Sequence, residues 1–223
     1  MNEIIFFLFL ILIVSMLVIS ARLGKESLVA SMSMCALLSN IFVLKQIKLF
    51  GYTATASDAL ALGATLALNI LQEHYDKQTA QRAIVISFFC LVVYTCATML
   101  HCAYVPTGSD WSNIHYQALF SFMPRLTCAS LIVYYIAQQI DYYIYQHLKV
   151  HYLFEHQTRS FISTSISQAA DTILFTIGGL YGIVDNLGSI LVISYIFKVI
   201  TLVFCIVMLP FITRSAQKLY AIF

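Results

Sequence analysis

Long apolar stretches follow one another along the chain, and only short polar connections separate them. An α-helix needs about twenty apolar residues to cross the hydrocarbon core of a bilayer. Seven stretches approach or exceed that length, at residues 4–21, 27–44, 49–72, 83–104, 116–140, 160–184 and 186–213. The pattern therefore predicts an all-α fold, a polytopic integral membrane helical bundle of six or seven transmembrane helices.

The boundary between the second and third predicted spans allows two interpretations. Residues 42–57 contain Lys45, Lys48 and Gly51. They form either a short connection between two spans or a broken, re-entrant segment that lines a cavity. The first interpretation gives seven spans, and the second gives six.

The composition supports a membrane protein and leaves little chain for anything else. Hydrophobic residues make up 61% and charged residues 10% of the 223 residues. A soluble domain is about half apolar and about a quarter charged. We therefore expect residues 1–223 to form a single transmembrane domain with no soluble domain.

Lysine and arginine are divided unevenly between the two sides of the predicted bundle. With the N-terminus outside, the inner connections carry Arg22, Lys25, Lys77, Arg82, Lys149, Arg159, Arg214 and Lys218. The outer connections carry Lys45 and Lys48. Because short cytoplasmic loops are enriched in basic residues, this division predicts a multi-pass protein of the inner (plasma) membrane with a cytoplasmic C-terminus.

Motifs for catalysis are absent from the sequence. It has no H-E-x-x-H, G-x-S-x-G or Walker motif, so we expect neither an enzyme nor ATP hydrolysis by this chain, and no cofactor or metal. His147, His151 and Glu155 share a helical face, but this loose spacing is more typical of a solvated helix than of a metal site.

The six cysteines lie in apolar runs and are interpreted as small packing residues. The net charge of +2, without a dense basic patch, does not indicate nucleic-acid binding.

Full charges interrupt three of the apolar stretches, at Arg125, Asp171 and Lys198. A charge at the bilayer centre costs about 2.5 to 3.5 kcal/mol on insertion scales, so it persists only when it is paired, hydrated or needed. We expect these side chains to face the bundle interior. Helical spacing places Gln168 and Phe175 on the same side as Asp171.

A second polar stripe follows the third predicted span. Its members are Asp58, Thr65, Asn69, Gln72 and Glu73. Taken alone, Asp171 and Lys198 are explained equally well as a buried ion pair that fixes helix register. Several polar-faced helices together with Arg125 favour a pore or a binding cavity near the middle of the membrane.

Several polar segments occur in a particular order along the chain. They are Ser39-Asn40, Thr55-Ala56-Ser57-Asp58, Asn69-Ile70-Leu71-Gln72-Glu73, Pro124-Arg125, Ser167-Gln168, Asp171-Thr172 and Ser194-Tyr195 with Lys198. Their order and approximate spacing resemble the queuosine precursor transporters, within the vitamin uptake transporter group. The resemblance covers nearly the whole chain. It implies an importer of 7-deazaguanine bases such as preQ0, preQ1 or queuine, which supply the queuosine modification of tRNA.

The residues suit such a ligand chemically. A guanine-like base presents an N–H and an exocyclic amine side by side, which one carboxylate accepts together, and a carbonyl oxygen that needs a donor. Asp171 and Gln168 supply both, and Phe175 or Tyr195 offers an aromatic ring for stacking. Six further residues are expected to bind the substrate. Asn40, Asn69 and Gln72 add amide groups. Arg125 and Lys198 neutralise or orient the carboxylates of Asp171 and Glu73, and Glu73 is the sixth of these residues.

Three functional hypotheses follow from these observations. The first is a self-contained secondary transporter that contacts the deazapurine and the lipid bilayer, with no direct contact to nucleic acid. The second is the substrate-binding membrane subunit of an energy-coupling-factor vitamin importer, which needs partner ATPase subunits. The third is a scaffold whose charges only lock helices together. The sequence leaves the oligomeric state open, a homo-oligomer included.

Overall fold

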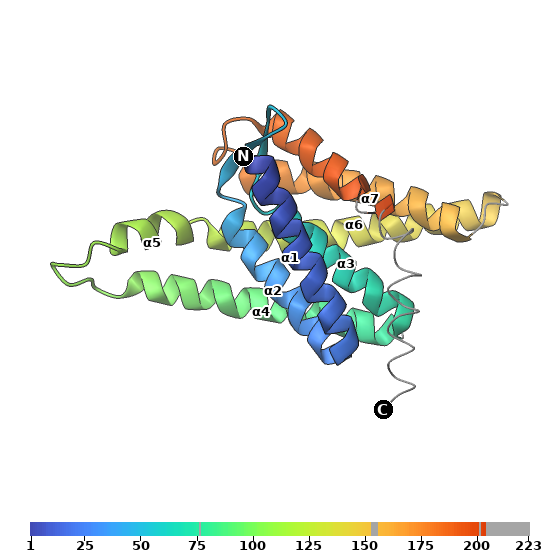
Figure 1. The fold of residues 1–223 in the computed structure, drawn as a ribbon, viewed down its shortest axis with the longest axis horizontal. Helices are drawn as coiled ribbons and strands as arrows, with labels where there is room; N and C mark the ends of the chain where they lie inside the picture. The colour runs from blue at the N-terminus through green and yellow to red at the C-terminus, as the bar shows by residue number, and fades with distance from the viewer. Residues whose placement is uncertain (76, 153–155, 201, 204–223) are drawn as a thin grey trace.

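The computed structural model describes residues 1–75, 77–152, 156–200 and 202–203, and these are mainly helical (Figure 1). The labelled elements are α1 (Asn2–Leu23), α2 (Lys25–Phe42), β1 (Gln46–Leu49), β2 (Tyr52–Thr55), α3 (Asp58–His74), α4 (Lys77–Ala103), α5 (Asn113–Phe120), α6 (Met123–His151) and α7 (His156–Leu180). A further helix spans Leu187–Ile200 and is called the last helix below. The end of the seventh predicted span, residues 204–213, lies outside the described residues.

The connection between α2 and α3 is a β-hairpin. β1 and β2 pair antiparallel, and Leu49 lies opposite Tyr52. Phe50 and Gly51 between them both have positive φ, at 50° and 85°, as the two central residues of a type I′ turn require. The predicted start of the third span at residue 49 is therefore wrong, because this segment pairs as strands and α3 begins only at Asp58.

The fifth predicted span, residues 116–140, also differs from the structure. Ser121 and Phe122 separate α5 from α6. Pro124 lies in the first turn of α6, where its missing N–H breaks no helical hydrogen bond. α6 then continues to His151, which carries the helix past the predicted end and includes Asp141.

Three helical segments of the described residues are long and apolar enough to cross a membrane: Asn2–Leu23, Gln78–Ala103 and Asn113–His151, which joins α5 and α6. Large apolar side chains cover the outside of the first two, including Phe7, Leu8 and Ile11 on α1 and Phe89 and Leu100 on α4. Such surfaces are stable against lipid tails rather than against water. The chain is thus an all-α helical membrane protein, and six or seven crossings stay a prediction.

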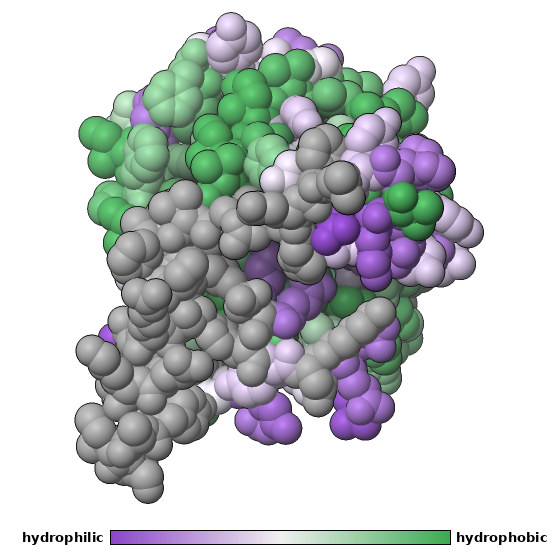
Figure 2. All heavy atoms as spheres, turned by 90° about the vertical axis from the view of Figure 1, so that its right-hand side faces the viewer, coloured by the Kyte–Doolittle hydropathy of each residue, from purple (hydrophilic) through white to green (hydrophobic). Residues whose placement is uncertain are grey.

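The ends of the helices gather at two different sides of the bundle. α1, α3 and α6 end toward the bottom and right of Figure 1, whereas the hairpin and the α4–α5 connection lie toward the top and left. Figure 2 faces the right-hand end, where hydrophilic side chains gather across the middle and right of the view and apolar ones lie above them. Arg214 and Lys218, two of the expected inner basic residues, lie outside the described residues.

Helices α1, α2 and α3 pack around a shared apolar core, which includes Leu17, Leu28 and Leu71. Gly63 of α3 allows the closest approach in this core. A Cβ atom at this position would lie 2.5 Å from Cγ2 of Ile13 and 3.0 Å from Sγ of Cys35. Small residues at such crossings supply packing energy in membranes, where no hydrophobic force draws helices together.

The first prediction concerns this contact. We expect Gly63→Ala to lower the free energy of unfolding by about 1 to 3 kcal/mol, because the added methyl group overpacks the core. Gly178→Ala is the matched control, since Gly178 is also helical and its added methyl group would have Cβ of Ala129 as the nearest side-chain atom, 4.0 Å away. Thermal unfolding of the purified variants in detergent measures both effects. Equal melting temperatures for the two variants would contradict the packing described for α1, α2 and α3.

Candidate functional site

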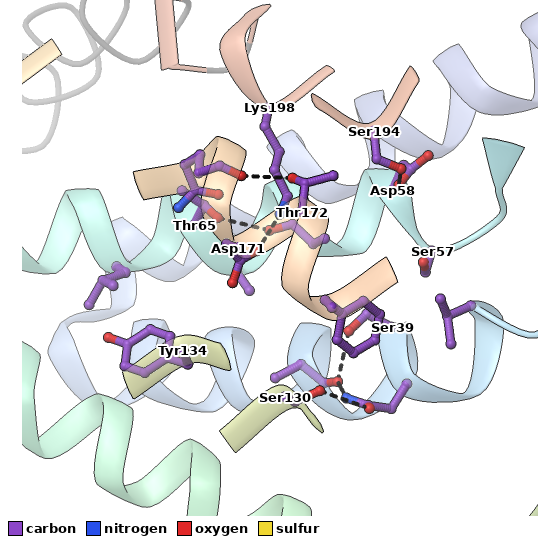
Figure 3. Close-up of a pocket in the computed structure, with 18 of the residues that line it drawn as sticks. Ser39, Ser57, Asp58, Thr65, Ser130, Tyr134, Asp171, Thr172, Ser194 and Lys198 are labelled. Atoms are coloured by element: carbon purple, nitrogen blue, oxygen red, sulfur yellow. Dashed lines mark hydrogen bonds and ion pairs between the residues drawn. The ribbon is translucent and has the colours of Figure 1, made fainter. Parts of the chain in front are cut away.

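A cavity of about 320 Å³ lies between the helices, a volume at the lower end of the range for small-molecule sites. Residues of α2, α3, α4, α6, α7 and the last helix line it, together with Thr55 at the end of β2. Polar side chains from α3, α6, α7 and the last helix are directed toward the same space (Figure 3). Seven expected site residues line this cavity: Asn40, Asn69, Gln72, Gln168, Asp171, Phe175 and Lys198.

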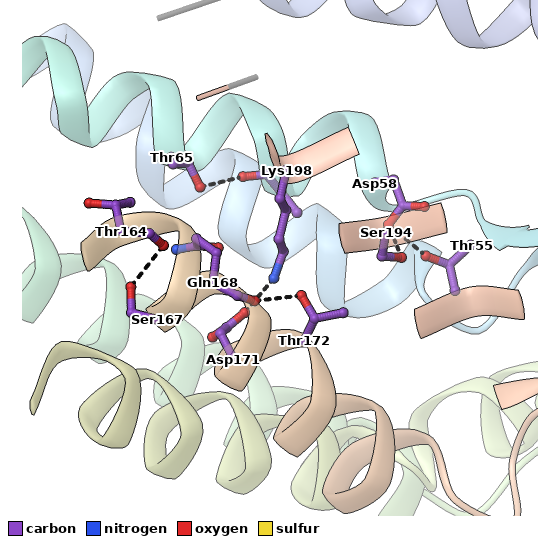
Figure 4. A network of polar contacts seen from close by, with 11 residues as sticks. Thr55, Asp58, Thr65, Thr164, Ser167, Gln168, Asp171, Thr172, Ser194 and Lys198 are labelled. Atoms are coloured by element: carbon purple, nitrogen blue, oxygen red, sulfur yellow. Dashed lines mark hydrogen bonds and ion pairs between the residues drawn. The ribbon is translucent and has the colours of Figure 1, made fainter. Parts of the chain in front are cut away.

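An ion pair crosses from the last helix to α7. Nζ of Lys198 donates to Oδ2 of Asp171, and their side chains are only 18% and 25% exposed (Figure 4). Each charge balances the other in a setting where either one alone would be costly. The pair therefore fixes one wall of the cavity, and it agrees with the expected pairing of Lys198 with Asp171.

α7 presents three of the expected residues to the cavity along one face. Gln168 lies one turn before Asp171, and Phe175 lies one turn after it. The hydroxyl of Thr172 donates to the backbone oxygen of Gln168 at 2.8 Å, which holds Thr172 back against its own helix. This wall therefore offers an amide, a carboxylate and an aromatic ring in succession.

The opposite side of the cavity contains α2 and α3. The amide of Asn40 is engaged at both ends, because Nδ2 donates to the Ala36 oxygen at 3.0 Å and Oδ1 accepts from Ser130 at 3.3 Å. Asn69 and Gln72 reach the cavity from α3. The side chain of Glu73 lies outside the described residues, so its expected pairing with Arg125 or Lys198 stays a prediction.

Two expected site residues lie away from the cavity. Arg125 is exposed, which contradicts the expectation that it faces the bundle interior, and it does not bond Asp171. Its Nε donates to the Gly178 oxygen at 3.0 Å and its Nη2 to the Tyr181 oxygen at 2.7 Å. A guanidinium at these positions satisfies the free carbonyls and the negative dipole at the end of α7. Tyr195 does not line the cavity, and its hydroxyl donates to the Ser165 oxygen at 3.5 Å.

The cavity includes α6 residues that the sequence analysis left out of the site. They are Ser130, Tyr134, Gln138 and Asp141. Their spacing of three or four residues places them on one helical face, which is the signal that identifies them. Oδ1 of Asp141 lies 3.5 Å from the Ser167 hydroxyl, which makes a shorter hydrogen bond of 3.0 Å to the Thr164 oxygen, so this carboxylate faces α7.

Asp58 at the start of α3, which is not among the expected substrate-binding residues, is also part of the cavity wall. Its side chain is buried, with the residue 7% exposed. Oδ1 accepts hydrogen bonds from Ser194 at 2.8 Å and from Thr55 at 3.3 Å. Oδ2 is buried and has no hydrogen-bond partner among the described residues.

The charges around the cavity do not balance. The described lining residues contain three carboxylates, Asp58, Asp141 and Asp171, against the single amine of Lys198. With every group in its ionised form, the wall carries a net charge of −2. The arrangement suits a ligand that donates hydrogen bonds or carries positive charge.

The histidines noted on α6 lie near its end, outside the cavity. The ring centroids of His147 and His151 are 4.6 Å apart. The third residue of that motif, Glu155, lies outside the described residues. Within the described part of the chain, no three histidine, cysteine or acidic side chains are grouped as metal ligands would be.

Comparison with known proteins places the chain in a family. The family model described as "Putative vitamin uptake transporter" matches residues 55–214, which includes every cavity-lining helix except α2. A protein of Bacillus subtilis (strain 168) named "Probable queuosine precursor transporter" is 28% identical over 162 residues, which cover 72% of this chain and 71% of that relative. No solved structure matches the chain. The resemblance noted in the sequence is thus confirmed, and the chain belongs to the family of vitamin uptake transporters.

Proposed function

We propose that this chain imports queuosine precursors, the 7-deazaguanine bases preQ0, preQ1 or queuine, and so supplies the queuosine modification of tRNA. The observation that carries the proposal is the α7 wall, where Gln168, Asp171 and Phe175 line one cavity in succession. The name of the Bacillus subtilis relative supports the same class of substrate.

The wall matches the base group by group. Oδ2 of Asp171 is bonded to Lys198, and the carboxylate can still accept further N–H donors, because two carboxylate oxygens offer about four acceptor sites. The adjacent N–H and amine of a guanine-like base are such donors. The amide of Gln168 can donate to the ring carbonyl, and the ring of Phe175 can stack on the flat heterocycle. Asn69 and Gln72 add amides from α3.

We place the protein in the inner membrane with the ends of α1, α3 and α6 on the cytoplasmic side. The basic residues near these helix ends and the hydrophilic face in Figure 2 support this orientation. Residues 1–223 then form one transmembrane domain. A topology reporter fused at the C-terminus tests the orientation, because it is active only in the compartment where the C-terminus lies.

The second prediction concerns recognition of the base. We expect Gln168→Ala to reduce uptake of labelled preQ1 about 10- to 100-fold, because a ligand carbonyl left without a donor costs about 1 to 3 kcal/mol. Gln139→Ala is the matched control, since Gln139 lies on α6, is exposed and does not line the cavity. Uptake is measured in cells that make each variant at the same level. Normal uptake by Gln168→Ala would remove this residue from the site.

The third prediction separates transport from a purely structural role of the ion pair. The double variant Asp171→Asn with Lys198→Gln removes both charges together and leaves no unpaired charge, so it should fold. We expect it to lose uptake of the base, because the carboxylate that accepts the ring donors is gone. A scaffold whose charges only lock helices together requires the opposite, a folded double variant with unchanged activity.

The fourth prediction distinguishes the two modes of transport. Proteoliposomes that contain only the purified chain should accumulate the base when an ion gradient is imposed, as a self-contained secondary transporter does. The alternative, a substrate-binding subunit of an energy-coupling-factor importer, binds the base in this preparation and accumulates it only after ATPase subunits are added. Uptake that needs those subunits would contradict the first mode.

A further inference from the structure

Asp58 has a carboxylate oxygen that nothing in the described chain satisfies. The residue is 7% exposed, and Oδ2 is buried without a hydrogen-bond partner among the described residues. It lines the cavity at the end next to the hairpin, away from the ion pair of Lys198 (Figure 4). Buried carboxylate oxygens are normally bonded, so this one requires an explanation.

The neighbouring hydroxyl groups have no hydrogen left for this oxygen. Thr55 and Ser194 each donate their single hydroxyl hydrogen to Oδ1 of Asp58. In the 2.9 Å contact between Thr55 and Ser57, Ser57 must therefore be the donor. All three hydroxyl hydrogens are directed away from Oδ2, and what remains around Asp58 is a group of oxygen lone pairs.

The described residues also provide no spare positive charge for Asp58. Lys198, the amine in the cavity wall, is bonded to Asp171 on α7. The other titratable groups that line the cavity, Asp141 and Tyr134 on α6, carry negative charge or none. A buried carboxylate without a bonded counter-charge is strongly unfavourable, so Oδ2 of Asp58 favours a positive species that the described residues do not supply.

We propose that Asp58, with the hydroxyl oxygens of Thr55, Ser57 and Ser194, binds the monovalent cation, Na⁺ or H⁺, whose entry drives uptake. Carboxylate and hydroxyl oxygens are the ligands that hard cations prefer, and a proton on Oδ2 neutralises the same charge. The site adjoins the hairpin, on the side predicted to face outward, where a coupling cation enters. The inference rests on the proposed transport function, which it extends to an energy source.

The last helix connects this site to the substrate wall. Ser194 bonds Asp58 on α3, and Lys198, one turn further along the same helix, bonds Asp171 on α7. Because the two side chains lie on one face of a rigid helix, a shift of that helix changes both contacts together. Cation occupancy at Asp58 thereby alters the position of the carboxylate proposed to bind the base.

The test compares two transport modes in proteoliposomes of the full-length protein with labelled preQ1. Counterflow exchanges labelled for unlabelled base and needs no driving gradient, whereas accumulation needs one. We expect an imposed Na⁺ or proton gradient to drive accumulation by the wild type. Asp58→Asn should keep counterflow and lose accumulation about tenfold or more. Asp110→Asn is the control, since Asp110 is exposed in the α4–α5 loop and bonds only its neighbour Ser112 in the contacts described.

The response of accumulation to the two gradients decides between Na⁺ and H⁺ and can contradict the proposed site. If accumulation of preQ1 by the wild type depends on the Na⁺ gradient or on the proton gradient, and Asp58→Asn abolishes this dependence, the result supports the site. The gradient that is required then identifies the bound cation. Accumulation by Asp58→Asn that equals the wild type under the same gradient overturns it, as does wild-type accumulation indifferent to both gradients.

A second measurement does not depend on the substrate. The melting temperature of the purified wild type should rise with NaCl relative to choline chloride, or change with pH, by an amount that Asp58→Asn removes. Such a shift without any transport of preQ1 would overturn the proposed substrate and still support the cation site. Identical responses of the wild type and Asp58→Asn to both cations overturn the cation site.

Discussion

The structure depends on how this chain keeps charged groups inside an apolar bundle. Lys198 and Asp171 join the last helix to α7 across the cavity, and neither side chain has more than a quarter of its surface exposed. In such surroundings a single charge is costly, so the two helices are held in the one arrangement that pairs them. The α7 wall, the position of Ser194 and the shape of the cavity all follow from that arrangement.

The same constraint explains why the cavity is built from several helices. α7 supplies an amide, a carboxylate and an aromatic ring, α3 supplies amides, and α6 supplies a further carboxylate, Asp141. Each polar group is tolerated because it faces other polar groups rather than lipid, while apolar side chains of α1 and α4 cover the outside. Family membership says that the chain is a transporter, and the distribution of these groups is the basis for proposing what it carries.

Much of the fold could be predicted from the sequence because long apolar runs without charges have few alternatives to helices in lipid. The β-hairpin could not, because Lys45, Lys48 and Gly51 indicate a break in the apolar pattern without indicating that the residues on either side of the turn pair as strands. The predicted span in α6 ended one residue before Asp141. A charge marks the end of a helix that faces lipid, but it is acceptable within one that lines a cavity.

The site was partly predictable for a related reason. Asp171 and Lys198 stood out because each interrupts an apolar run, and their spacing placed Gln168 and Phe175 on the same wall. Arg125 stood out equally, yet its long side chain reaches the carbonyls at the end of α7, a tertiary contact that the sequence does not reveal. The importance of Asp58 depends on Ser194, which lies 136 residues away in the chain.

The central claim is that the cavity beside α7 binds a 7-deazaguanine base through the Asp171 carboxylate. Calorimetric titration of the purified protein with preQ1 tests it most directly, because binding is separated from transport and from its energy source. We expect saturable binding of one base per chain by the wild type, lost in the double variant Asp171→Asn with Lys198→Gln, which leaves neither charge unpaired and should keep its melting temperature. Absence of binding by the wild type, or equal affinity in the double variant, would contradict this claim.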